Sequence, residues 1–309
     1  MRLDLFRGTQ VTCFVGVLCM SLLTSCSSPP TIDSLGGVVL EFAVDDTRLT
    51  VPPSKEAIAR TVNVIRTRLN PTGDNGVTVR VTGTGRFEVG LLGVNTDARD
   101  HFVRLITQQG SLEFCVVANP RDHSGIIESA RKLPTESDEL QCDDGTVAVW
   151  MNLASIGSEG ESVEPPEFDS AHRKVQRGDE LEIRQCLVIR DLDDERVTGQ
   201  FLTRVGVGLD SQGKACVNLA FNKEGAHRLT LLTHRYSPAA NGYRRRLAII
   251  FDGWIRTTPF INTTMSDQCE ITGNFTREEL EDLVAVLSSG ELEIPLNPTP
   301  VSERVVRAK

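Results

Sequence analysis

After its first 25 residues the sequence lacks any long hydrophobic run. The longest uninterrupted apolar stretches there are no longer than Leu-Ala-Ile-Ile-Phe at 247–251. A helix needs about 20 mainly apolar residues to cross a bilayer. We therefore expect no transmembrane helix after residue 25.

The chain also lacks an excess of basic residues. It has 33 Lys and Arg against 42 Asp and Glu, for a net charge of −9. Nucleic-acid surfaces need clustered basic side chains that neutralise phosphates, so we predict no nucleic-acid partner. One short basic run, Arg244–Arg246, is interpreted as a solvated strand entrance. Contact with anionic lipid or a partner is the alternative for this run.

Motifs for metal, cofactor or covalent chemistry are missing as well. The sequence contains no Cys-x-x-Cys, no His-Glu-x-x-His and no Gly-x-Ser-x-Gly. His227 and His234 are seven residues apart but have no Cys or carboxylate at a matching spacing. The acidic stretch 190–196 lacks the Gly turn and distal Glu of a calcium loop. We predict no enzyme, no cofactor and no metal site; a hydrolase would need a polar cleft with convergent titratable groups.

The N-terminus is typical of an export signal. Arg2 and Arg7 precede an apolar run at 11–23, which is too short to span a membrane as a helix and ends in small residues. Leu-Thr-Ser-Cys at 23–26 resembles the bacterial lipobox. That resemblance implies a signal peptide at 1–25, a lipid on Cys26 that anchors the protein to a membrane, and a tether at 26–35. An ordinary cleaved signal is the alternative.

Two further expectations follow from the predicted cleavage. The removed segment carries Arg2, Arg7 and Asp4, so the mature charge would be −9 − (+1) = −10. Ser27 resembles the residue that follows the cysteine in lipoproteins sorted to the outer membrane.

Five of the eight cysteines lie beyond Cys26 and allow at most two disulfides in an oxidising compartment. Cys142 and Cys186 bracket an irregular segment and are the pair that we predict. The alternative is that most of the five are small buried apolar side chains.

Residues 36–118 read as strand, helix, strand, strand, helix, strand. This β-α-β-β-α-β order is the ferredoxin-like unit. The first helix is expected to begin at Ser54 and stop at Pro71, and 111–118 is expected to be the closing strand. Gly36-Gly37 is predicted to allow a close backbone approach or a bulge.

The remainder divides into an insert, a second domain and a tail. Residues 119–185 are acidic and punctuated by Pro and Gly around one apolar island at 147–153, which favours an irregular linker or surface insertion. Residues 186–296 alternate strands and helices, so the fold class is α+β for both domains. Residues 297–309 are interpreted as a C-terminal tail.

The end of the second domain has strong local signals. Asp252-Gly253 between two apolar strands predicts a type I′ hairpin turn, and Pro259 ends the second of those strands. Thr276 with Glu279 forms a capping box, and Gly290 stops the helix. A strand at 290–296 is expected to return the chain toward the first domain.

Taken in order, these motifs resemble the first periplasmic domain of SecD, a subunit of the bacterial SecDF protein-export complex. In the second domain the matching positions are Asp252, Gly253, Pro259, Ile271, Gly273, Phe275, Thr276, Leu287, Gly290 and Leu292. In the first domain they are Asp33, Leu35, Gly36, Gly37, Arg68, Leu69 and Gly73.

The resemblance implies a ferredoxin-like base and a mobile head that contacts the translocating polypeptide or Sec translocase subunits. It also implies a location facing the periplasm. Intramembrane ionisable residues couple proton flow to motion, and with no span for them we expect no proton-driven motor activity. The alternative function is an envelope interaction or scaffold lipoprotein that keeps this fold without the export role.

Overall fold

The structure is a computed structural model. It describes residues 32–70, 76–83, 85–93, 98–143, 145–154, 169–177, 181–190, 195–273 and 275–308. The predicted signal peptide and Cys26 lie outside these ranges. Residues 31–309 form one compact unit. Within the described ranges, no helix has both the length and the hydropathy needed to cross a membrane.

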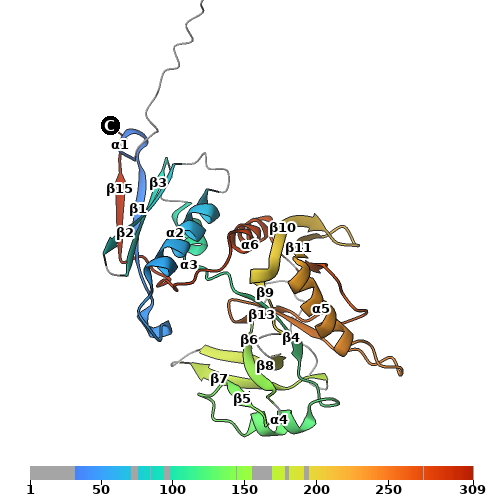
Figure 1. The fold of residues 1–309 in the computed structure, drawn as a ribbon. Helices are drawn as coiled ribbons and strands as arrows, with labels where there is room; N and C mark the ends of the chain where they lie inside the picture. Colours follow the sequence, from blue (N-terminus) through green and yellow to red (C-terminus); the bar gives the residue numbers. More distant parts are fainter. Residues whose placement is uncertain are drawn as a thin grey trace, which may run out of the picture. The chain divides into compact units, whose positions relative to one another are not determined.

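The fold combines helices with three sheets (Figure 1). The helices are α1 (Ile32–Leu35), α2 (Lys55–Leu69), α3 (Arg99–Thr107), α4 (Ser124–Arg131), α5 (Lys223–Arg235) and α6 (Arg277–Ser289). The strands are β1 (Gly37–Ala43), β2 (Val77–Gly83), β3 (Arg86–Leu92), β4 (Leu112–Val117), β5 (Glu139–Gln141), β6 (Val147–Leu153), β7 (His172–Arg177), β8 (Leu181–Arg190), β9 (Val197–Thr198), β10 (Leu202–Leu209), β11 (Ala215–Phe221), β12 (Leu247–Phe251), β13 (Trp254–Thr257), β14 (Gln268–Ile271) and β15 (Ser302–Val306). The α+β class is confirmed.

The first sheet has the strand order β15-β1-β3-β2, with antiparallel neighbours throughout. Together with α2 and α3 it forms what we call the base. The expected β-α-β-β-α-β order is present, but its last strand is β15 and not the predicted strand at 111–118. The predicted tail at 297–309 is therefore wrong, because residues 302–306 pair with β1.

Gly36 and Gly37 lie where β1 begins between β3 and β15. Both have positive φ, +70° and +145°. A Cβ on Gly37 would lie 2.1 Å from the carbonyl oxygen of Leu91, and one on Gly36 would lie 2.8 Å from that of Val306. The predicted close backbone approach is confirmed, since a larger residue at either position would collide with a neighbouring strand.

The second sheet closes on itself. β6 pairs with β13, β13 with β12, β12 with β4, β4 with β8, and β8 again with β6. Its interior holds Cys115, Val117, Val149, Leu153, Cys186, Val188, Ala248, Ile250 and Ile255. β5, β7 and β9 extend this sheet at its margins.

The predicted irregular insert at 119–185 is therefore largely wrong. It supplies α4 and the strands β5, β6 and β7 as well as the start of β8. The prediction failed in part because β7 has the polar sequence His-Arg-Lys-Val-Gln-Arg. A strand at the margin of an antiparallel sheet pairs through its backbone and can have few apolar side chains. Only the apolar island at 147–153 signalled a strand.

The third sheet has the order β10-β11-β14. It contributes, with α5, to a core that runs without interruption into the base. We call the elements from β4 to α6 the head. α6 packs against α2 and α3 of the base and against β10 and β11 of the head, and in Figure 1 it lies between α2 and β10.

Candidate functional site

The chain passes between base and head at two places, residues 108–111 and 290–301. The linker or insertion that the sequence suggested at 119–185 is neither of these crossings, because it lies inside the head. After α6 the chain runs along the base and buries Leu292, Ile294 and Leu296. The expected return to the base is confirmed, but this segment is not the predicted strand, because beyond one isolated bridge from Leu296 to Val44 it has no ladder partner.

Arg68, in the last turn of α2, forms hydrogen bonds with the chain at both crossings. Its side chain is buried and donates to the carbonyl oxygens of Leu105 at 2.8 Å and of Gln108, at the end of α3. It also donates to Gly290 O and Ser289 Oγ, both at 3.0 Å, at the end of α6. The last carbonyls of a helix have no partner inside it and carry partial negative charge, so a cation there is favourable. Burial lowers the pKa of Arg68 to about 10, which leaves it charged at neutral pH.

Asp252 secures the first crossing from the head. Its Oδ1 accepts hydrogen bonds of 2.8 Å from the backbone N–H groups of Gly110 and Ser111. Burial raises the pKa of this carboxyl, while these hydrogen bonds and the charge of Arg68 oppose the rise. Asp252 and Gly253 have φ of +50° and +76°, so the predicted type I′ turn is confirmed. The role of the Asp252 side chain is additional and was missed.

Beside this junction lies a cleft of about 540 Å³ between α3, α6 and the outer face of β4 and β12. We call it the α3–α6 cleft. Its floor is apolar, made by Leu112, Ile249, Phe251, Ile271, Phe275 and Leu283. Its rim is charged and polar, made by Arg104, Gln108, Arg256, Thr276, Glu278, Glu279 and Asp282. Such a combination suits a ligand with apolar side chains on a polar backbone.

The start of α6 forms one wall of the cleft. Thr276 Oγ1 accepts from the N–H of Glu279 at 3.2 Å, and Glu279 Oε2 accepts from the N–H of Thr276 at 2.8 Å, so the capping box is confirmed. Half-buried Phe275 packs against the main core just before this cap. A Cβ on Gly273 would lie 2.9 Å from the Phe275 ring, so this glycine makes room for the ring.

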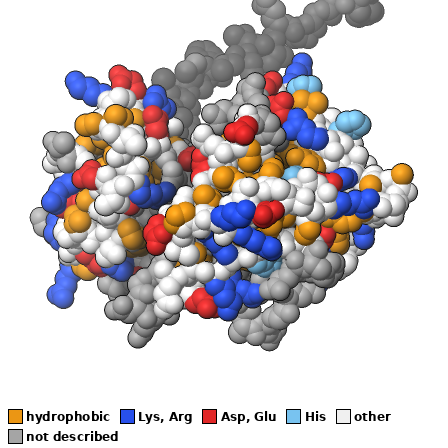
Figure 2. Space-filling view, turned by 90° about the horizontal axis from the view of Figure 1, so that it is seen from below, with side chains coloured by type: hydrophobic (Ala, Val, Ile, Leu, Met, Phe, Trp, Pro, Cys, Tyr) orange, Lys and Arg blue, Asp and Glu red, His pale blue; other side chains and the backbone are white. Residues whose placement is uncertain are grey.

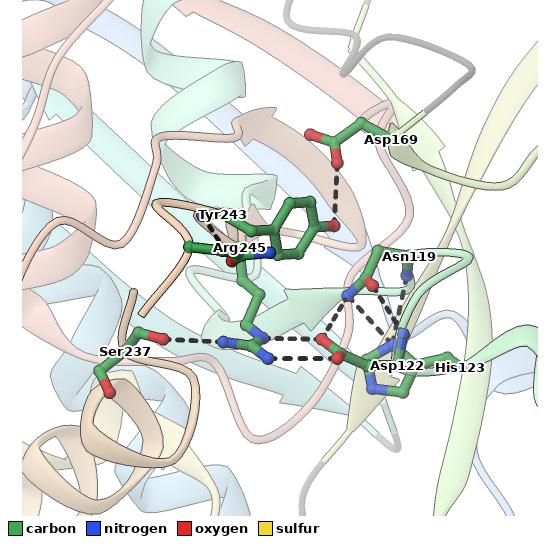
Figure 3. A network of polar contacts seen from close by, with 8 residues as sticks. Asn119, Asp122, His123, Asp169, Ser237, Tyr243 and Arg245 are labelled. Carbon is green, nitrogen blue, oxygen red and sulfur yellow. Dashed lines mark hydrogen bonds and ion pairs between the residues drawn. The ribbon is translucent and has the colours of Figure 1, made fainter. Parts of the chain in front are cut away.

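A polar network outside the cleft joins the start of α4 to the strand entrance at 243–246 (Figure 3). Arg245 donates to Asp122 at 2.7 and 3.1 Å and to the carbonyl of Ser237 at 2.8 Å. Tyr243 donates to Asp169 at 3.0 Å, and its pKa is raised to about 12, chiefly by burial and then by this bond. Asp122 also accepts from the Asn119 side chain. With its groups paired internally, we interpret the network as structural.

The basic run 244–246 is thus only partly the solvated segment that we expected, because Arg244 is exposed whereas Arg245 and Arg246 are half-buried. Arg244 donates to Asn262 at 3.0 Å, and its guanidinium lies 4.5 Å from the centre of the Phe260 ring. Arg246 pairs with Asp169 and stacks on the same ring. All three guanidinium groups are engaged within the chain. On the face shown in Figure 2, acidic and basic side chains are interspersed with hydrophobic ones.

The predicted disulfide between Cys142 and Cys186 is not formed in the structure. Cys186 in β8 lies opposite Met151 of β6, whereas Cys142 donates its N–H to Thr146, five positions before Met151. At about 3.3 Å per residue this register separates the two cysteines by roughly 16 Å. A disulfide needs Cα atoms about 4.4–6.8 Å apart.

The sequence-predicted residues thus fall into separate groups. Gly273, Phe275 and Thr276 come together at the cleft, and Asp252, Gly253 and Gly290 lie at the junction. Gly36 and Gly37 lie at the start of β1 in the base. Pro259 is exposed and lies two residues after the end of β13, and its carbonyl oxygen accepts from the N–H of Leu247. Sequence reasoning missed His101, Arg104 and Asp282. The acidic face of α6, with Glu278 and Asp282 four residues apart, was the one available signal for them.

Comparison with known proteins shows which proteins this chain is similar to. Residues 175–294 match the family model described as SecDF, P1 head subdomain. SecD of Endomicrobium trichonymphae is 25% identical over 284 residues, covering 89% of this chain and 52% of that protein. SecD of Aquifex aeolicus is 36% identical over 100 residues, covering 32% and 19%. The chain therefore spans about half or less of the length of these relatives.

A solved structure shows the same fold. The crystal structure of SecDF in its super-membrane-facing form aligns with a TM-score of 0.55 at 22% identity, covering 90% of this chain and 32% of that one. Residues 175–294 are thus similar in sequence to the SecDF P1 head subdomain, and the chain that contains them resembles a SecD-type periplasmic domain in fold.

Proposed function

We propose that this chain acts outside the cytoplasm in Sec-dependent protein export, where it binds a segment of the translocating polypeptide or of a translocase subunit. The observation that carries the proposal is the α3–α6 cleft, with its apolar floor and charged rim, in a chain whose residues 175–294 match the SecDF P1 head subdomain.

The chemistry of the cleft suits a partner whose sequence varies. Apolar burial is non-directional and contributes roughly 25 cal/mol per Å² of surface removed from water. The floor can therefore accept different apolar side chains of an unfolded chain. Arg104 and Glu278 on the rim are more than half exposed, so they can adjust to polar groups that flank those side chains.

The two crossings suggest how binding could be linked to motion. We propose that the head moves on the base through residues 108–111 and 290–301, with Arg68 and Asp252 holding the crossings in the arrangement described. The proposal assigns polypeptide binding to this chain and assigns it neither catalysis nor the proton-driven step. An export assay from purified components in which this chain alone conferred dependence on a proton gradient would contradict that division.

Site-specific photo-crosslinking in cells tests the binding role. A crosslinkable residue at Phe275, in the cleft, should form adducts with secretory chains in transit. The same residue at Leu231, which is exposed on α5 and outside the cleft, is the matched control and should not. Equal adducts at both positions, or none together with normal secretion in a deletion strain, would reject the proposal. Adducts with envelope proteins but with no secretory chain and no Sec subunit would favour the scaffold alternative.

The lipid anchor on Cys26 is a separate proposal and rests on the sequence motif alone. Cys26→Ser should release the protein from the membrane fraction into the soluble periplasmic fraction. A protein that stays with the membranes after this substitution is not held there by a lipid on Cys26.

A further inference from the structure

His101, Glu278 and Asp282 form a compact group of metal-ligating side chains. His101 lies on α3 of the base, whereas Glu278 and Asp282 lie on α6. The two acids are four residues apart and so share one face of the helix. One ligand atom from each of the three lies within 4.8 Å of the other two.

The two distances from His101 match those around a tetrahedral metal ion. His101 Nδ1 lies 3.2 Å from Asp282 Oδ1 and 3.6 Å from Glu278 Oε1. Zinc binds histidine nitrogen at about 2.0–2.1 Å and carboxylate oxygen at about 2.0–2.2 Å, which puts neighbouring ligand atoms of a tetrahedron about 3.3–3.5 Å apart. The separations of 3.2 and 3.6 Å bracket this range.

A second observation points to a missing partner. His101 Nδ1 is buried and, although it lies 3.2 Å from Asp282 Oδ1, it forms no hydrogen bond with suitable geometry among the described residues. Buried polar atoms are nearly always satisfied, and an unsatisfied one costs about 1–3 kcal/mol. A metal ion at this nitrogen would supply the absent interaction and would also neutralise Asp282, whose side chain is 13% exposed.

Arg104 competes with an ion for the same carboxylates. Its Nη2 lies 2.8 Å from Glu278 Oε1 and 3.7 Å from Asp282 Oδ2. The Arg104 side chain is 51% exposed, and ion pairs of exposed side chains stabilise weakly. A divalent ion can therefore displace the guanidinium from both acids.

We propose that His101, Glu278 and Asp282 bind a divalent transition-metal ion of the zinc class, which joins α3 of the base to α6. One imidazole and two carboxylates suit Zn²⁺ better than Mg²⁺, because imidazole is a borderline ligand. Three protein ligands leave a coordination position open. Since Glu278, Asp282 and Arg104 line the rim of the α3–α6 cleft, the bound ion would lie at its edge.

Calorimetric titration with ZnCl₂ tests the site. The protein would be residues 31–309, the single compact unit described above, purified without a histidine tag and freed of metal. We expect saturable binding of one Zn²⁺ per chain and a rise in Tm with zinc concentration. Binding to the folded state alone stabilises it by mass action.

Variants separate this site from adventitious surface binding. His101→Gln and Asp282→Asn should each weaken Zn²⁺ binding about tenfold or more. His227→Gln, at an exposed histidine on α5, should leave it unchanged. Arg104→Ala should strengthen binding, because it removes the competing cation. Circular dichroism would verify that each variant is folded.

Several results would overturn the proposal. These are no saturable binding in the parent protein, equal affinity in His101→Gln and the parent, or affinity that does not rise in Arg104→Ala. If His101 only pairs with the two acids as a protonated imidazole, the first of these results is obtained.

Discussion

The guanidinium group of Arg68, in the last turn of α2, donates a hydrogen bond of 3.0 Å to the carbonyl oxygen of Gly290, where α6 ends. The same side chain reaches the end of α3 at Leu105. One buried cation therefore ties the C-terminal ends of three helices together at the place where the chain passes between base and head.

Replacing Arg68 with Leu should lower the free energy of unfolding by about 3 kcal/mol, because it leaves several buried carbonyls without a donor. Chemical denaturation measures the loss. Arg60→Leu on the same helix is the control: its side chain is 60% exposed in a surface ion pair with Glu293, so stability should hardly change. Equal losses in the two variants would mean that the Arg68 contacts do not stabilise the junction.

Asp252→Ala should destabilise the protein by about 2–3 kcal/mol, through two lost hydrogen bonds and a residue with φ of +50° that alanine adopts poorly. Asp252→Asn keeps an acceptor oxygen and tolerates this backbone conformation, so it should cost much less. Thermal unfolding of the two variants compares them directly. If Asn is as damaging as Ala, the carboxylate charge and not the turn and acceptor geometry is what matters.

Stability should fall as the pH drops below about 6.5 because of His123. Burial lowers the pKa of this imidazole below its ordinary value. The negative charge of Asp122 opposes this shift, and the positive charge of Arg245 adds to it. Between the lowered pKa and about 6.5 the unfolded chain therefore binds more protons than the folded one, and the free energy of unfolding rises with pH.

Urea unfolding at pH 7.5 and pH 5.5 measures this dependence. His123→Gln should flatten it, whereas His227→Gln at an exposed position should not. A dependence as steep in His123→Gln as in the parent would exclude His123 as its source.

A thiol assay on denatured residues 31–309 should count all five cysteines without reductant, since the Cys142–Cys186 pair is not formed. In the native protein we expect Cys142, which is only half-buried, to react first. Burial raises the pKa of Cys269 to about 12 and raises that of Cys216, so both should react slowly. A count of three thiols in the denatured state would contradict this and would show that one disulfide is present.

Removing residues 302–309 should destabilise the base strongly, because it deletes β15 and leaves the edge of β1 unpaired. Removing residues 308–309 is the matched control and should have little effect. Hydrogen exchange of the β1 amides would detect the exposed edge. Unchanged protection after the longer deletion would mean that 302–309 behaves as the tail that the sequence suggested.

Features that depend on near neighbours in the chain could be predicted. The capping box of Thr276 and Glu279, the turn at Asp252-Gly253 and the start of α2 after Ser54 each involve residues within four positions. Their geometry follows from local hydrogen bonds and backbone preferences.

Features that depend on residues far apart in the sequence could not be predicted. β15 is a short polar strand whose pairing with β1 is visible only in three dimensions. The residues of the cleft floor, such as Ile249 and Ile271, look like any other core positions of a strand. The resemblance to SecD marked Arg68 in the sequence, but nothing local shows that its side chain reaches the ends of α3 and α6.

The pairing of β1 with β15 makes the base a domain whose first and last strands are separated by the entire head. Because the chain is synthesised from its N-terminus, β1 is made long before its partner strand β15. The entropy of closing so long a loop grows only with the logarithm of its length, so the delay affects the order of events more than the final stability. During that interval one edge of β1 is open to other strands. The sheet of the base can therefore be completed only after every residue of the head has been made.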